Sequence, residues 1–243
     1  GMGVPFRWTS LDATMQTLLQ PGGPTDTLGD ERLDYLRGNN VNEVSQGGSF
    51  RNRAFKLGDI VSSSPVFVGP PRFPYRDDLE TKPYSAFRIA QKDRTPMVYA
   101  GANDGMLHGF HAGAAADGGG VERLAYVPTA VYPNLHLLSR QDYAHKFYVD
   151  GTPSAVDVFF GNNWHTVLVG GLARGGQAVY ALDVTNPSTF SESSADDIVL
   201  WEFDDRVTGP GDTGDVDMGF SYSRPAVTKL RNGKWVAIFG NGY

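Results

Sequence analysis

Three aspartates in a glycine-rich stretch, Asp212, Asp215 and Asp217, are the residues whose type and spacing best suit a metal ion. Carboxylate oxygens are common calcium ligands, and an EF-hand loop places acids at alternate positions with a glutamate at its twelfth. Here the spacing is three and then two residues, and no glutamate stands at the twelfth position. We therefore interpret the stretch as a solvated loop, and keep the three aspartates as candidate calcium ligands.

Other side chains capable of catalysis or metal binding are scattered along the chain. Among the five histidines, His108 and His111 are close in sequence, but a spacing of three on a strand directs two side chains to opposite faces. Adjacent acids such as Asp77 and Asp78 lie in a polar stretch and are interpreted as solvated rather than as an acid–base pair. We predict no catalytic residue, no enzyme activity and no cofactor bound within this chain.

A stretch rich in proline and arginine, residues 70–94, carries aromatic side chains interleaved with arginines. The residues that we single out are Arg72, Phe73, Tyr75, Arg76, Tyr84 and Phe87. Exposed aromatic and arginine side chains are typical of protein interfaces, so one interpretation is an interaction surface. The alternative is that the stretch folds back and buries its aromatic residues on its own structural unit.

The composition excludes several classes of protein. The chain has 243 residues and a formal net charge of -6, whereas a nucleic-acid-binding domain shows a basic stripe over the phosphates. It has no cysteine, which excludes a disulfide scaffold and a cysteine-ligated metal. No apolar run approaches the roughly 20 residues that span a membrane. The 30 glycines and 15 prolines indicate many turns, and so favour an all-β fold.

The elements that must position these residues begin with two short helices. Apolar residues in 10–19 have helical spacing after Ser10, which is a typical N-cap. Residues 30–37 repeat the pattern with Asp30 as the cap, an acidic first turn, and Gly38 as the stop. Each helix has little apolar surface of its own. We therefore expect both to pack against the rest of the chain.

From Leu57 onward the pattern changes to short strands that recur in a fixed order. A turn and a proline lead into the first strand of each unit, a β-branched run ending in glycine forms the second, and two further strands follow. The expected strands are 64–68, 97–101, 106–110 and 122–127, then 152–156, 166–170, 178–183 and 198–203, then 224–227 and 235–240. Val98, Val167 and Val236 occupy equivalent places in the three second strands.

A four-strand unit that recurs with turns between its strands is typical of a β-propeller blade. We predict an all-β, incomplete propeller of about two and a half blades with a short helical N-terminal lead-in. The lead-in is residues 1–56 and the propeller is residues 57–243, with blades at 57–130, 147–206 and, in part, 219–243. An irregular β-sandwich with accidental spacing is the alternative that the pattern leaves open.

One turn indicates which type of propeller this is. Ala181-Leu182-Asp183-Val184-Thr185, followed by Trp201 in the fourth strand, is similar to the turn-and-tryptophan arrangement of quinoprotein-like propellers. In those proteins the aromatic residue wedges between blades. The first unit keeps a reduced version, in which Tyr126 takes the place of the tryptophan.

Several longer motifs resemble the C-terminal domain of type IV pilus biogenesis proteins of the PilC/PilY family. They include residues 57–66, 97–108, 147–153, 169–172, 181–185 and 232–243, and the lead-in segments 34–38 and 50–53 also fit. The resemblance implies a modified β-propeller that is exported to the outer membrane, the cell surface or the pilus tip. It also implies a role in pilus assembly by opposing retraction, and in adhesion and twitching motility.

The resemblance also implies partners and a cofactor. Pilin or minor pilins, and the host-cell surface, are the expected partners, with no nucleic acid. The family binds calcium through an aspartate-rich loop that follows the Gly-Asn-Gly-Tyr motif, and this chain ends at that motif, Gly240 to Tyr243. Calcium is therefore expected for the full-length protein rather than for this chain, which we interpret as a piece of a longer protein.

Two other functions remain open for such a propeller, because a fold does not dictate a function. One is a dehydrogenase that uses pyrroloquinoline quinone. The absence of cysteine argues against it, because no vicinal pair is available to stack on the quinone. The other is a carbohydrate-binding propeller.

Overall fold

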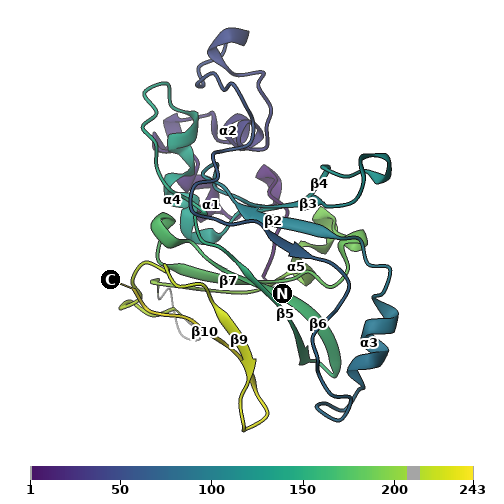
Figure 1. Ribbon diagram of the computed structural model, residues 1–243. Coiled ribbons are helices and arrows are strands. Elements are labelled where there is room, and N and C mark those ends of the chain that lie inside the picture. The colour runs from purple at the N-terminus through teal and green to yellow at the C-terminus, as the bar shows by residue number, and fades with distance from the viewer. Residues whose placement is uncertain (1, 207–213, 243) are drawn as a thin grey trace.

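The computed structural model describes residues 2–206 and 214–242. Within them, the strands form two four-stranded antiparallel sheets and a two-stranded hairpin. Figure 1 shows the two sheets and the hairpin following one another, with the lead-in helices beyond one end and α3 at the opposite end. The all-β, incomplete propeller predicted from the sequence is confirmed.

Each sheet follows the chain from its first strand to its last, as in a propeller blade. The first blade contains β1 (Val66–Val68), β2 (Met97–Gly101), β3 (Leu107–His111) and β4 (Glu122–Tyr126). The second contains β5 (Ser154–Phe160), β6 (Asn163–Gly171), β7 (Ala178–Asp183) and β8 (Val199–Asp204), and the hairpin contains β9 (Ala226–Lys229) and β10 (Trp235–Ile238). All ten strands lie where the repeat predicts them.

The helices are short and lie outside the sheets (Figure 1). They are α1 (Ala13–Leu18), α2 (Gly29–Leu36), α3 (Tyr84–Ala90), α4 (Tyr132–Leu135) and α5 (Ala195–Ile198), with 3-10 turns at Trp8–Ser10, Gly23–Thr25, Val44–Gln46, Ala115–Asp117, Thr129–Val131, His136–Ser139, Ala173–Gly175, Pro187–Thr189 and Glu192–Ser194. Among the described residues, no helix is long and apolar enough to cross a membrane.

The helix starts differ from the sequence expectation. Asp12, not Ser10, caps α1, because its Oδ1 accepts a hydrogen bond from the Met15 backbone N at 2.8 Å. Helix α2 starts at Gly29 without a side-chain cap, so the prediction of Asp30 as the cap is wrong. Gly38 ends α2 as predicted, with a φ of 100° that glycine adopts without strain.

The lead-in helices share one apolar core with the first two blades. Leu19 and Leu33 are buried against Leu135 and Leu138 of the segment that joins those blades. The buried Arg32 donates from Nε to Ser139 Oγ at 3.1 Å, which supplies a partner for a charged side chain in this core.

Aromatic residues of the outermost strands fill the spaces between blades. Tyr126 of β4 packs against Tyr180 of β7 with ring centroids 5.0 Å apart. Trp201 of β8 packs in a second apolar cluster that contains Val227 and Trp235 of the hairpin. The inner strand β5 contacts β1 on one side and the hairpin on the other. The aromatic wedges expected of quinoprotein-like propellers are thus present at both junctions.

The 70–94 insertion folds across its neighbours instead of projecting into solvent. Tyr84 is 1% exposed and Phe87 is 9% exposed, and both cluster with Trp164 of β6. Phe73 and Tyr75 pack partly buried against the same cluster. The second blade and the hairpin therefore cover these rings, fully for Tyr84 and Phe87 and in part for Phe73 and Tyr75, so the insertion folds onto neighbouring units rather than onto its own blade.

Candidate functional site

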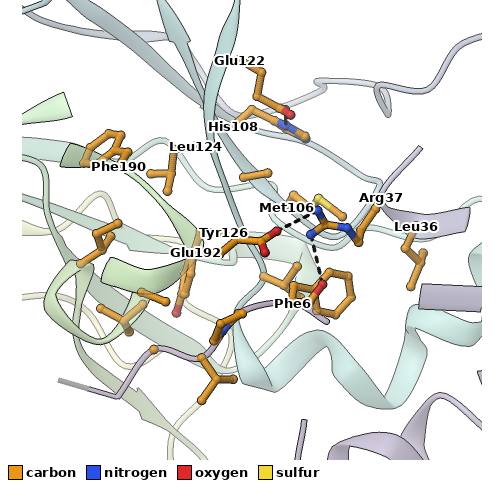
Figure 2. A pocket seen from close by; sticks show the side chains of 18 of the residues that line it. Phe6, Leu36, Arg37, Met106, His108, Glu122, Leu124, Tyr126, Phe190 and Glu192 are labelled. Atoms are coloured by element: carbon orange, nitrogen blue, oxygen red, sulfur yellow. Dashed lines mark hydrogen bonds and ion pairs between the residues drawn. The ribbon is translucent and has the colours of Figure 1, made fainter. Parts of the chain in front are cut away.

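A cleft of about 600 Å³ lies between the lead-in and the first two blades. Strand β4 forms one wall along its whole length, the 2–6 segment and the end of α2 form another, and the 190–199 segment of the second blade closes it. Figure 2 shows Phe6, Met106, Leu124 and Phe190 among the side chains that line it. The lining is largely apolar, and charged side chains lie among the apolar ones.

The wall of the cleft formed by β4 is an edge strand of its sheet. β4 is the last strand in the order of its sheet, so the backbone groups that face away from β3 are not paired with another strand within the described part of the chain. Glu122, Arg123 and Ala125 are exposed along it, while Leu124 is partly buried. An exposed edge of this kind is a template for an added strand.

A charged bridge beside the cleft links the lead-in to the second blade. Arg7 Nε donates to both Glu192 oxygens, at 2.9 and 3.0 Å, and Arg37 Nη2 donates to Glu192 Oε1 at 2.9 Å. Arg37 Nη1 also donates to the carbonyl of Phe6 at 3.1 Å (Figure 2). The hydrogen bond from Arg7 is the main cause that lowers the pKa of Glu192, so its carboxylate stays charged and holds the lead-in on the second blade.

His108 is a doubly paired cation at the wall of this cleft. Its Nδ1 lies 2.6 Å from Glu122 Oε1, and its Nε2 lies 3.1 Å from both oxygens of Asp104. Burial opposes the charged form, but the hydrogen bonds to the two carboxylates prevail and raise the pKa of His108 to about 9. The imidazolium therefore joins β3, β4 and the turn between β2 and β3. This is a structural role, because both ring nitrogens are occupied.

A partly buried carboxylate, Glu202, forms part of the cleft next to the junction of the blades. The hydroxyl of Tyr126 and the backbone N of Thr129 donate to it, the latter at 3.0 Å. Burial raises the pKa of Glu202, and also that of Tyr126. These contacts shape the cleft floor by fixing the first blade on the second.

The candidate calcium ligands are not brought together into a site that the structure can describe. Asp212 lies outside the described residues. Asp215 Oδ1 accepts from the Asp217 backbone N at 3.0 Å, and the Asp215 backbone N donates to the Asp204 carbonyl at 2.9 Å. These contacts hold the loop itself. Across 2–206 and 214–242, no group of three or more His, Cys, Asp or Glu side chains is arranged to hold a metal.

The predicted interaction residues separate into two groups. The arginines Arg72 and Arg76 are exposed, and Arg76 pairs with Asp78 at 2.6 Å. The aromatic residues Tyr75 and Tyr84 pack instead on Trp164, with ring centroids 5.5 and 4.9 Å away. A partner surface on the insertion therefore stays a prediction, and is limited to its polar outer side.

Sequence reasoning missed the cleft. From the sequence alone, His108 is compared only with His111. The carboxylate of Asp104, four residues before His108, is the local feature that could have indicated an ion pair. Glu192 and Arg7 are 185 residues apart, and no local pattern joins them. Leu124 and Phe190 look like ordinary strand and loop residues until the two blades are placed side by side.

Comparison with known proteins gives consistent matches. A family model described as the PilY1 beta-propeller domain matches residues 57–243. The type IV pilus biogenesis factor PilY1 of Pseudomonas aeruginosa strain PAK is 42% identical over 98% of this chain, and a PilY1 homolog of Xylella fastidiosa is 39% identical over 92% of it. The matches cover 19% and 15% of those two proteins, so the chain spans less than a fifth of their length.

A solved structure agrees with these matches. The crystal structure of the P. aeruginosa PilY1 C-terminal domain is similar to this chain at 40% identity with a TM-score of 0.54, and covers 73% of this chain and 31% of that one. The resemblance drawn from the sequence motifs is thus confirmed. Because the family model matches well over half of the residues and the relatives match nearly all of them, this chain belongs to the PilY1 β-propeller family.

Proposed function

We propose that this chain is part of a type IV pilus biogenesis factor that acts without catalysis, through contacts with other proteins. The observation that carries the proposal is the PilY1 propeller match over residues 57–243, together with relatives that are named pilus biogenesis factors. The location that follows is the cell surface or the pilus tip. Calcium binding is proposed for the longer protein and not for this chain.

The cleft suggests how such contacts are made. An extended segment of a pilin or minor pilin adds to the free edge of β4, and its alternate side chains enter the apolar lining near Phe6, Leu124 and Phe190. Backbone hydrogen bonds along the strand give affinity, while the apolar lining selects the side chains. A bound subunit held in this way opposes retraction of the pilus, and the same propeller at the tip brings the cell into contact with a host surface.

Gene deletion tests the function. Removing the gene of the longer protein should reduce surface pili and twitching, and removing the retraction motor as well should restore the pili at least in part. Piliation is counted by electron microscopy and by shearing pili from the cells. Unchanged piliation and twitching in the deletion strain would show that the proposed function is wrong.

Cleft variants test the mode of binding. The full-length protein with Leu124→Asp or Phe190→Asp should fail to restore piliation, because a charge is placed in the apolar lining. Leu230→Asp is the matched control, since Leu230 is 41% exposed and is not among the cleft residues. The amount of each variant at the surface is measured with an antibody. Full piliation with both cleft variants present at normal level would exclude the cleft as the binding site.

A further inference from the structure

The wall of the cleft contains a second strand edge, and the chain itself already covers part of it. Strand β8 is the last strand in the order of its sheet, and its first residue, Val199, lines the cleft. Residues 2–5 lie on this edge, because the backbone N of Met2 donates to the Val199 carbonyl at 3.1 Å. One segment of the chain is therefore docked on the second blade within the cleft.

Gly3 allows this docking. A Cβ at that position would lie 2.0 Å from the Ala195 carbonyl oxygen and 2.8 Å from Val199 Cγ2, so only glycine lets the segment approach the second blade this closely. Val4 comes directly before Pro5, and the residue before a proline favours extended backbone. The surface formed by Ala195 and Val199, named the seat from here on, thus accepts an extended apolar segment with glycine at the point of contact.

The attachment of residues 2–5 to the seat is shallow. Met2 and Val4 are exposed, and within the described part of the chain the bond from Met2 is the one backbone hydrogen bond that joins this segment to the second blade. The ion pair of Arg7 with Glu192 follows the segment, but both side chains are about half exposed, and such pairs contribute little stability. A segment with few buried contacts opens locally at a small cost in free energy.

Phe6 marks the end of the part that can leave the seat. Its ring packs against Tyr132 with centroids 5.9 Å apart, and its carbonyl accepts from Arg37 Nη1 at 3.1 Å (Figure 2). Residues 2–5 can therefore lift while Phe6 stays in the apolar lining of the cleft. The Val199 carbonyl then becomes free to accept a hydrogen bond from another backbone.

We propose that residues 2–5 are a built-in competitor, which occupies the seat until an extended apolar segment of a partner displaces it. The partner's segment carries glycine where it passes Ala195, and its backbone N–H donates to the Val199 carbonyl in place of Met2. This inference rests on the proposed function, since it concerns the segment that enters the cleft, and it adds a second docking edge beside that of β4. A tethered segment competes at an effective concentration in the millimolar range, so the partner wins through its further contacts along the cleft.

A capped peptide that copies residues 2–5, acetyl-Met-Gly-Val-Pro-amide, tests the seat directly. Its binding at millimolar concentration is followed by NMR through the backbone amide signals of residues 195–199. Gly3→Ala should bind the peptide about tenfold more tightly than the wild-type chain, because its own segment no longer fits the seat. Gly240→Ala is the matched control and should bind as the wild type does, since a Cβ there would meet Ser223 Oγ at an ordinary 3.5 Å. Equal binding by wild type and Gly3→Ala, or binding by neither, would overturn the proposal.

A second peptide, with valine in place of the glycine, tests the fit at Ala195. It should not bind Gly3→Ala, because its side chain meets the Ala195 carbonyl, and binding as tight as that of the first peptide would contradict the proposed seat. A nitroxide label on Val4→Cys, in a chain without other cysteines, should become mobile when Gly3→Ala is added. If the label stays immobile, Gly3→Val replaces Gly3→Ala in the titration, with the same expected result and the same contradiction.

Thermal unfolding reports whether each variant is folded. The peptide titration reads the seat without pili, whereas gene deletion and the Leu124 and Phe190 variants read piliation without the seat. Peptide binding that is equal in wild type and Gly3→Ala therefore overturns the competitor alone, and unchanged piliation in the deletion strain overturns the proposed function.

Discussion

The Tyr126 hydroxyl of β4 donates a hydrogen bond to the Glu202 carboxylate of β8, and so joins the outer strands of two successive blades. Both residues lie at the floor of the same cleft. Tyr126 also packs on Tyr180 across the same junction. One aromatic side chain thus combines apolar packing with a buried polar contact, which sets how the first blade sits on the second.

Tyr126→Phe should lower the free energy of unfolding by about 1–3 kcal/mol, because the partly buried Glu202 carboxylate loses the hydrogen bond from the Tyr126 hydroxyl. Urea denaturation monitored by circular dichroism measures the change. Tyr75→Phe is the control, since no hydrogen bond of the Tyr75 hydroxyl is seen in the described structure, and it should change stability less. Equal effects of both variants would show that the Tyr126 contact contributes no stability.

Stability should fall as the pH rises from about 6.5 to about 9, because His108 has a pKa of about 9 in the folded protein against an ordinary value of 6.5. The folded state holds its proton more tightly, so this contribution is complete below pH 6.5 and is lost as the pH passes the folded value. The loss is on the order of 2–3 kcal/mol. His108→Gln should flatten the urea midpoint over this range, and a variant with the wild-type slope would contradict the assignment.

Trp164→Ala should destabilise the protein by about 3–5 kcal/mol and release the insertion, because the indole is buried in a cluster of rings. The indole N also donates to the Lys82 carbonyl at 2.8 Å. Trypsin should then cut faster after Arg76 or Arg88. Phe67→Ala, at a side chain 57% exposed, should change stability within about 0.5 kcal/mol. Unchanged proteolysis in Trp164→Ala would mean that the insertion is held elsewhere.

Gly151→Ala should destabilise the fold by about 1–3 kcal/mol or more, because a Cβ there would lie 2.1 Å from the Gly171 carbonyl oxygen. The backbones of Gly151 and Gly171 would have to move apart to make room for this Cβ, and that movement would disturb the second blade. Gly240→Ala is the matched control, since its nearest neighbour, Ser223 Oγ, would lie at an ordinary 3.5 Å. A thermal unfolding midpoint that falls equally in both variants would rule out the close approach as the cause.

Much of the fold can be predicted from local patterns. Side chains alternate between the two faces of a strand, and glycine and proline favour the backbone conformations of turns. The ten strands can therefore be predicted without knowledge of the strands beside them. The regular spacing of Val98, Val167 and Val236 further indicates that the strands group into repeated blades. The long motifs were sufficient to identify the family.

The sites depend on contacts that no local pattern encodes. Tyr84 donates to Asp157 at 2.5 Å, 73 residues away, so the insertion is committed to the second blade and its aromatic rings are not free for a partner. Asp150 lies in the 147–153 motif, but its contact with the Ser62 backbone N arises only when the turns of two blades meet. The sequence by itself determined the strands, their order and the family. Tertiary structure alone decided which side chains are covered, which edge is open and where the cleft forms, because burial and pairing depend on residues far apart in the chain.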